Sequence, residues 1–279
     1  MYSEFLSGPW SIVLALAVFF LMVWPGYALL YLLGFGSDRW PWARFAGPAV
    51  TLSFWIIALS GTVWARLTLE QTAIPIWIAT LLLAVIGFCL DASSWRKARV
   101  VSEANGPWLW LMTGATVAIP FLVMPASFRF GLADFPNSTS ADSWSYVAMA
   151  DYLLTIPRGM EGGLSALHQY AAHLMATRNA TPAMLGFLSI GLGWVKVSQT
   201  VVLFCLIVLF AHATALVAFA ATIFGRAGAA GALLVIVGLG WPANIVHAGN
   251  FDQLLMLPRL HFWWERVRAA RAQVSLLVF

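Results

Sequence analysis

Long runs of uncharged, mostly apolar residues alternate with short polar connections along this chain. Six runs are each close to the roughly 20 residues that a helix needs to cross the hydrocarbon core of a bilayer. They cover residues 9–34, 46–65, 73–90, 107–126, 198–222 and 228–248. The pattern predicts an all-α, polytopic transmembrane helical bundle with about six spans. Trp24-Pro25-Gly26 lies inside the first run and predicts a kink, because proline removes a backbone donor.

The segment 127–197 is too long to be a simple connection between two spans. It contains two helical patterns, at 142–153 and 164–175, which we expect to be amphipathic helices at the membrane surface. Residues 183–195 are apolar but too short to cross, which favours a re-entrant or interfacial helix. If they do cross, every later segment changes sides.

Composition supports the membrane assignment. Charged residues make up 9% of the 279 and hydrophobic residues 61%. A soluble domain carries roughly a quarter charged residues, so these values exclude a soluble globular enzyme and a disordered chain. The net charge of +4 is spread over the connections. This distribution argues against nucleic-acid binding and for contact with the lipid bilayer.

Basic residues gather in the connections that follow the first, third and fifth runs. By the positive-inside rule these connections are cytoplasmic. The long segment 127–197 then lies outside, and we expect a bacterial inner (plasma) membrane. The basic residues are Arg39, Arg44, Arg96, Lys97, Arg99 and Arg226.

The predicted spans hold almost no ionisable groups, which counts against an ion-coupled transporter. The acids concentrate outside the spans, at Asp134, Asp142, Asp151, Glu161 and Asp252. Asp142 opens a helical pattern in which Tyr146, Met149 and Leu153 share its face. Thr139-Ser-Ala-Asp142 also resembles a capping box, in which Asp142 would serve only the helix N-terminus. Spacing alone leaves capping and catalysis equally open.

The second helical pattern contains His168 and His173, whose spacing of five does not suit a helical metal pair, so we predict no histidine metal site. Contact of His168 with a substrate hydroxyl, or its packing at the interface, is the better interpretation. Arg158 and Arg178 flank the pattern and could pair with a phosphate, with simple solvent exposure as the alternative.

The pattern Asp-x-x-x-Tyr-x-x-x-Ala-x-x-Leu, from Asp142 to Leu153, resembles the GT-C membrane glycosyltransferases, which use polyprenyl-phosphate-linked sugars as donors. A second acid in Asn250-Phe251-Asp252-Gln253 adds to this resemblance. It implies Asp142 as the first catalytic candidate, Asp252 as the second and Asp134 as an alternate. Tyr146 and His168 would contact the substrate.

The resemblance also implies how the leaving group is handled. Negative charge develops on the departing polyprenyl phosphate and calls for a cation such as Arg158, Arg178 or Arg259, or a divalent metal ion. The sequence does not identify a cofactor. A non-catalytic integral membrane subunit, packing with membrane protein partners in a larger complex, is the alternative function.

The chain divides into three parts on this interpretation. Residues 1–106 form a three-span segment, residues 107–255 form the GT-C-like core, and residues 256–279 form a basic C-terminal segment. We expect an N-terminal part, or a shortened member, of such an enzyme.

Overall fold

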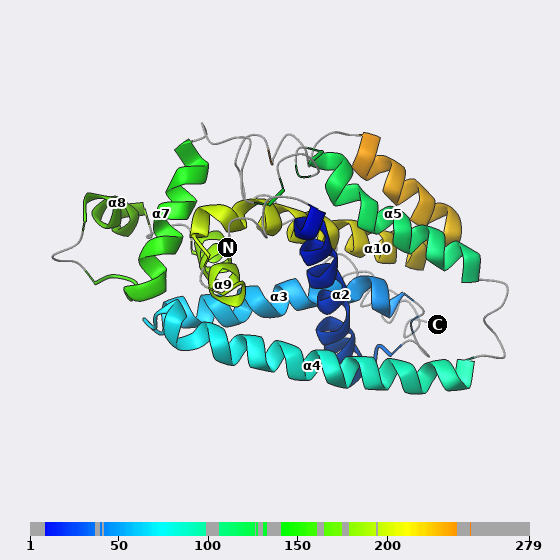
Figure 1. The fold of residues 1–279 in the computed structure, drawn as a ribbon. Helices are drawn as coiled ribbons and strands as arrows, with labels where there is room; N and C mark the ends of the chain where they lie inside the picture. The colour runs from blue at the N-terminus through cyan, green and yellow to red at the C-terminus, as the bar shows by residue number, and fades with distance from the viewer. Residues whose placement is uncertain are drawn as a thin grey trace, which may run out of the picture.

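The computed structural model describes residues 9–36, 40, 42–98, 106–125, 127, 131–132, 141–160, 165–174, 179–193, 195–238 and 246. All regular structure within these ranges is helical (Figure 1). This confirms the all-α prediction.

Four helices are long and apolar enough to cross a membrane: α2 (Pro9–Leu32), α3 (Ala43–Trp64), α4 (Leu69–Ala98) and α10 (Val201–Gly238). They fit an integral membrane protein. The fourth predicted span corresponds to α5 (Gly106–Val123), which is shorter. Its 18 residues give a rise of about 27 Å, slightly less than the bilayer core. The count of six spans therefore stays a prediction.

A sharp turn at Gly225 divides α10 into two antiparallel segments. Gly225 has φ 62° and ψ −146°, a conformation that only glycine adopts without strain. A Cβ atom on Gly228 would collide with the backbone oxygen of Ala220, although eight residues of straight helix would separate them by about 12 Å. Residues on both sides of the turn pack together, namely Ala213, Val217 and Ala221 against Ala229, Ala232, Leu233 and Ile236. The break falls between the two predicted runs at 198–222 and 228–248.

The turn at Gly225 and the predicted inner connections lie at one end of the bundle. Arg44, at the start of α3, donates from Nε to Asp91 Oδ1 near the end of α4, at 2.6 Å. The indole of Trp40 donates to Thr222 Oγ1, three residues before Gly225, at 2.8 Å. These contacts bring the N-terminus of α3, the C-terminal part of α4 and the turn in α10 together. We call this the basic end.

Two further helices lie at the opposite end of the bundle: α7 (Ala141–Thr155) and α8 (Ala166–Leu174). Figure 1 shows α7 running across the ends of α3, α4 and α10 rather than along them. The guanidinium of Arg158, just beyond α7, lies 4.6 Å from the ring centroid of Trp64 at the end of α3. Both helical patterns predicted in the long segment are therefore confirmed as helices, and they share one end of the bundle.

The short helix α9 (Ala180–Gly191) is buried in the bundle. Ten consecutive residues, 181–190, are buried, and the ring of Phe187 stacks on that of Trp77 of α4 with centroids 4.5 Å apart. The chain before α9, in α7, and the chain after it, in the 3₁₀-helix η1 (Val197–Thr200), line the same pocket. The described residues of α7 and η1, before and after α9, therefore lie at the same end of the bundle, while α9 itself is buried. A re-entrant helix stays a prediction.

Pro25 lies inside α2, which is one continuous helix, so the predicted kink stays a prediction. The side chain of Thr51, on α3, accepts a hydrogen bond from the backbone N–H of Gly26 at 2.8 Å and donates one to the backbone oxygen of Met22 at 2.6 Å. An ideal helix would join these two backbone groups directly. A hydroxyl from the neighbouring helix α3 therefore makes hydrogen bonds to both of these backbone groups beside Pro25.

Candidate functional site

Helix α7 supplies one wall of the candidate site. Tyr146, Met149 and Leu153, which the sequence places on one helical face, are all buried in the protein. Ala148, Ala150 and Tyr152 are buried as well, because α7 packs against both α9 and α8. Trp144 and Asp151 remain exposed on the other side. α7 is therefore more deeply packed than a surface helix with a single apolar face.

Helix α8 is held on α7 by two polar contacts. His168 Nε2 lies 3.2 Å from Asp151 Oδ2, and the hydroxyls of Ser145 and Tyr170 lie 3.0 Å apart. The ring of Tyr152 meets His168 edge to face, with centroids 6.0 Å apart. These contacts fix the imidazole beside the carboxylate.

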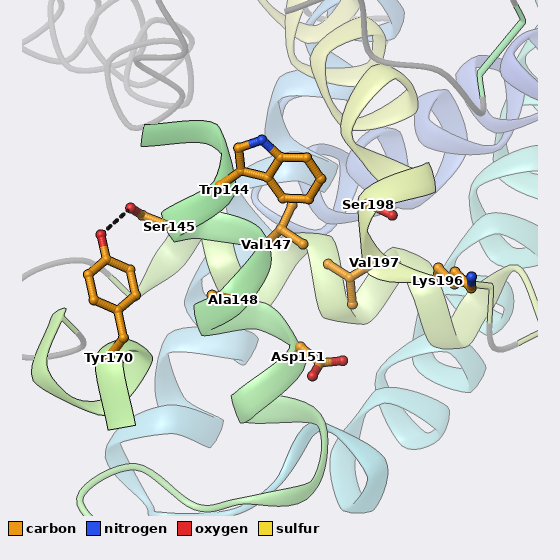
Figure 2. Close-up of a pocket in the computed structure, with 9 residues that line it drawn as sticks. All are labelled: Trp144, Ser145, Val147, Ala148, Asp151, Tyr170, Lys196, Val197 and Ser198. Atoms are coloured by element: carbon orange, nitrogen blue, oxygen red, sulfur yellow. Dashed lines mark hydrogen bonds between the residues drawn. The ribbon is translucent and has the colours of Figure 1, made fainter. Parts of the chain in front are cut away.

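A pocket of about 670 Å³ lies between α7, α8 and η1 (Figure 2). We call it the α7–η1 groove. It is lined by Trp144, Ser145, Val147, Ala148, Asp151, Tyr170, Lys196, Val197 and Ser198. Four of the five α7 residues follow the spacing i, i+3, i+4 and i+7 and form one stripe along the helix, and Ser145, at i+1, lies beside it.

The groove is amphipathic along its length. Val147, Ala148 and Val197 form apolar walls in the middle, and Asp151 lies one turn further along α7 than Ala148. The side chain of Asp151 is 50% exposed and that of His168 23%, so the carboxylate is open to a ligand while its partner is more enclosed. Lys196 lies on the opposite wall, just before η1 (Figure 2). Such a groove can hold an apolar body together with a polar, hydroxyl- or phosphate-bearing group.

The structure places none of the predicted site residues in the lining of this groove. His168 contacts the lining residue Asp151 but does not line the groove itself. Tyr146 is 1% exposed, because its side chain is buried between α7 and the helices packed on it. Asp142 lies in the first turn of α7, two residues before the lining residue Trp144. Arg158 stacks on Trp64 and does not line the groove. The predicted residues Asp134, Arg178, Asp252 and Arg259 lie outside the described residues.

None of the nine lining residues is among the predicted site residues. Three of the nine, Asp151, Lys196 and Trp144, bring a charge or a large aromatic ring to the groove. A signal for Asp151 is present in the sequence, because it interrupts an otherwise apolar stretch of helix between Ala150 and Tyr152. No local pattern connects it with Lys196, since the two are brought together only by the return of the chain through α9. In the described part of the chain, no three His, Cys, Asp or Glu residues form a group that could hold a metal ion.

No protein-family model, no curated protein and no solved structure matches the chain. The function must therefore be argued from the groove itself.

Proposed function

We propose that this protein is a membrane glycosyltransferase that moves a sugar from a polyprenyl-phosphate donor to an acceptor at the outer membrane surface. The observation that carries the proposal is the α7–η1 groove, which combines apolar walls with a carboxylate and an ammonium group, the carboxylate being in contact with the imidazole of His168. It lies on the helix whose sequence resembles the GT-C motif.

The chemistry of the groove suits sugar transfer from a lipid. An acceptor hydroxyl loses its proton as it attacks the anomeric carbon, and a carboxylate at hydrogen-bonding distance can take it. The leaving polyprenyl phosphate gains negative charge, which a nearby cation stabilises. Apolar walls next to these groups allow the lipid part of the donor to remain in a membrane-like environment.

The position of the groove supports an external site. Arg44 and the turn that precedes Arg226 lie at the basic end, whereas α7 and η1 lie at the other end of the bundle. Basic residues favour the cytoplasmic side of a membrane. We therefore infer that the groove opens outside the cell, where lipid-linked sugars serve as donors for envelope polymers.

The release of polyprenyl phosphate tests this function without knowledge of the sugar or the acceptor. Membranes containing the protein are supplied with a panel of polyprenyl-phosphate sugars, and the freed polyprenyl phosphate is measured by mass spectrometry. We expect release that depends on the protein and falls about 100-fold or more in Asp142→Asn if that residue takes the proton.

Glu70→Gln is the matched control, because Glu70 is an exposed carboxylate in the first turn of α4 and does not line the groove. It should release polyprenyl phosphate at the wild-type rate. Release no higher than in membranes without the protein, for every donor tested, would contradict a transferase. Recovery of the protein in a stable membrane complex would then favour the non-catalytic subunit.

A further inference from the structure

The Asp151–His168 pair is the part of the groove best built for proton transfer. Asp151 Oδ2 and His168 Nε2 are 3.2 Å apart, and they come from different helices. A carboxylate has about four acceptor positions on its two oxygens, so one contact to His168 leaves room for a substrate hydroxyl. The 50% exposure of Asp151 shows that this remaining side is accessible.

The surroundings of His168 restrict its orientation. Its backbone N–H donates to Ser165 Oγ at 3.3 Å, and its ring lies edge to face with Tyr152 at an interplanar angle of 82°. The hydroxyl of Tyr152 in turn donates to the backbone oxygens of Pro157 and Met160. The imidazole is therefore held by the same local structure that closes the end of α7. Held in this way, it can orient the Asp151 carboxylate and stabilise its charge.

Lys196 provides a positive charge on the facing wall. Among the described residues that line the groove, Asp151 carries the negative charge and Lys196 carries the positive charge. Lys196 precedes η1, and Thr200 Oγ1 donates to the backbone oxygen of Leu185 in α9 at 3.2 Å. η1 is thus tied to the buried helix α9, which fixes the backbone that carries Lys196.

We propose that Asp151 is the proton acceptor of the transfer reaction, that His168 positions it, and that Lys196 faces the phosphate of the donor. This inference rests on the proposed transferase function. The acceptor oxygen forms a bond to the anomeric carbon as the bond from that carbon to the phosphate oxygen breaks. The acceptor proton passes to the carboxylate of Asp151, and the bonding electron pair leaves with polyprenyl phosphate, opposite the ammonium of Lys196.

Three single variants, assayed in reconstituted protein by polyprenyl phosphate release, separate these roles. Asp151→Asn should lower kcat by about 100-fold or more with little change in KM, because an amide cannot accept the proton. Lys196→Gln should raise KM for the donor and lower kcat. His168→Gln should lower kcat less than Asp151→Asn and alter the pH profile of kcat, an effect that a purely structural role would not produce.

Matched controls keep the effects specific. Glu70→Gln and Arg66→Gln remove an exposed carboxylate and an exposed guanidinium that do not line the groove, and both should retain wild-type kinetics. All variants are first compared with wild type by size-exclusion elution and thermal unfolding, so that loss of fold is not mistaken for loss of chemistry.

The two proposals fail in different ways. If the wild-type protein releases polyprenyl phosphate and Asp151→Asn keeps kcat within threefold, the assignment of Asp151 is wrong and the transferase function stands. Loss of activity in Asp142→Asn alone would then move the proton acceptor to the start of α7. If the wild-type protein releases nothing from any donor, the transferase function is wrong and the assignment of Asp151 falls with it.

Discussion

The hydroxyl of Thr51, on α3, is expected to stabilise the helical bundle through its two hydrogen bonds to the backbone of α2 beside Pro25. It accepts from the N–H of Gly26 and donates to the oxygen of Met22, and its side chain is fully buried. Pro25 has no N–H of its own to contribute at this level of the helix. Replacement of Thr51 by valine keeps the shape of the side chain and removes both hydrogen bonds.

The expected cost of Thr51→Val is about 2 kcal/mol. A side-chain hydrogen bond between membrane helices contributes roughly 0.6 kcal/mol on average, and a buried backbone group left without a partner costs about 1–3 kcal/mol. Two backbone groups of α2, the N–H of Gly26 and the oxygen of Met22, lose a hydrogen-bond partner, but relaxation of α2 can recover part of the lost stability. A change of about 2 kcal/mol corresponds to a shift of about thirtyfold in the unfolding equilibrium.

The assay is reversible unfolding in mixed detergent micelles with increasing sodium dodecyl sulfate, followed by tryptophan fluorescence. Thr62→Val is the matched control, because the Thr62 hydroxyl donates only to Ala58 of its own helix, at 3.1 Å. Thr51→Ser retains the hydroxyl and should lose less than half as much stability as Thr51→Val. Equal stability of Thr51→Val and Thr62→Val would refute the bridging role.

Three other substitutions test the packing of the bundle. Gly47→Ala should destabilise by about 1–3 kcal/mol in the same unfolding assay, because its Cβ would overlap a backbone oxygen of α2, whereas Gly61→Ala, with open space around it, should not. Gly225→Ala should lower the free energy of unfolding by about 1–3 kcal/mol, because alanine is strained at the backbone angles of Gly225. The weakened turn in α10 should be cleaved faster by protease, and an unchanged cleavage rate would contradict this. Asp91→Asn should cost about 1–2 kcal/mol by weakening the contact with half-buried Arg44, and thermal unfolding equal to wild type would argue against the pair.

Much of the helical framework could be predicted because a membrane span is a local property of sequence. The runs at 9–34, 46–65 and 73–90 correspond to α2, α3 and α4, since each is apolar for the length of a bilayer crossing. α4 begins earlier than its apolar run because Thr68 and Gln71 form a capping box: the N–H of each residue donates to the side chain of the other. That signal was also present in the sequence.

The candidate site was only partly predictable, because it depends on tertiary structure. Helical periodicity alone places Tyr146, Met149 and Leu153 on one face, but it does not predict that the face is buried against other helices. Periodicity does not predict that Asp151 and Lys196 line the same groove. They come together because the chain passes through α9 and then returns to the end of the bundle where α7 lies. The burial of α9 likewise depends on the aromatic surface that α3 and α4 provide, which a single helix pattern does not reveal.

Labelling of a cysteine in the groove tests the central claim most directly. Ser198→Cys is made in a Cys89→Ala background, with the buried Cys205 left in place, and intact cells are treated with a membrane-impermeant maleimide. Ala227→Cys, at the exposed basic end, is the control and should react only after the membrane is opened. We predict that Ser198→Cys is labelled from outside and that added undecaprenyl phosphate slows its labelling. Labelling only from the cytoplasmic side, or at a rate that undecaprenyl phosphate does not change, would contradict an external groove for lipid-linked sugars.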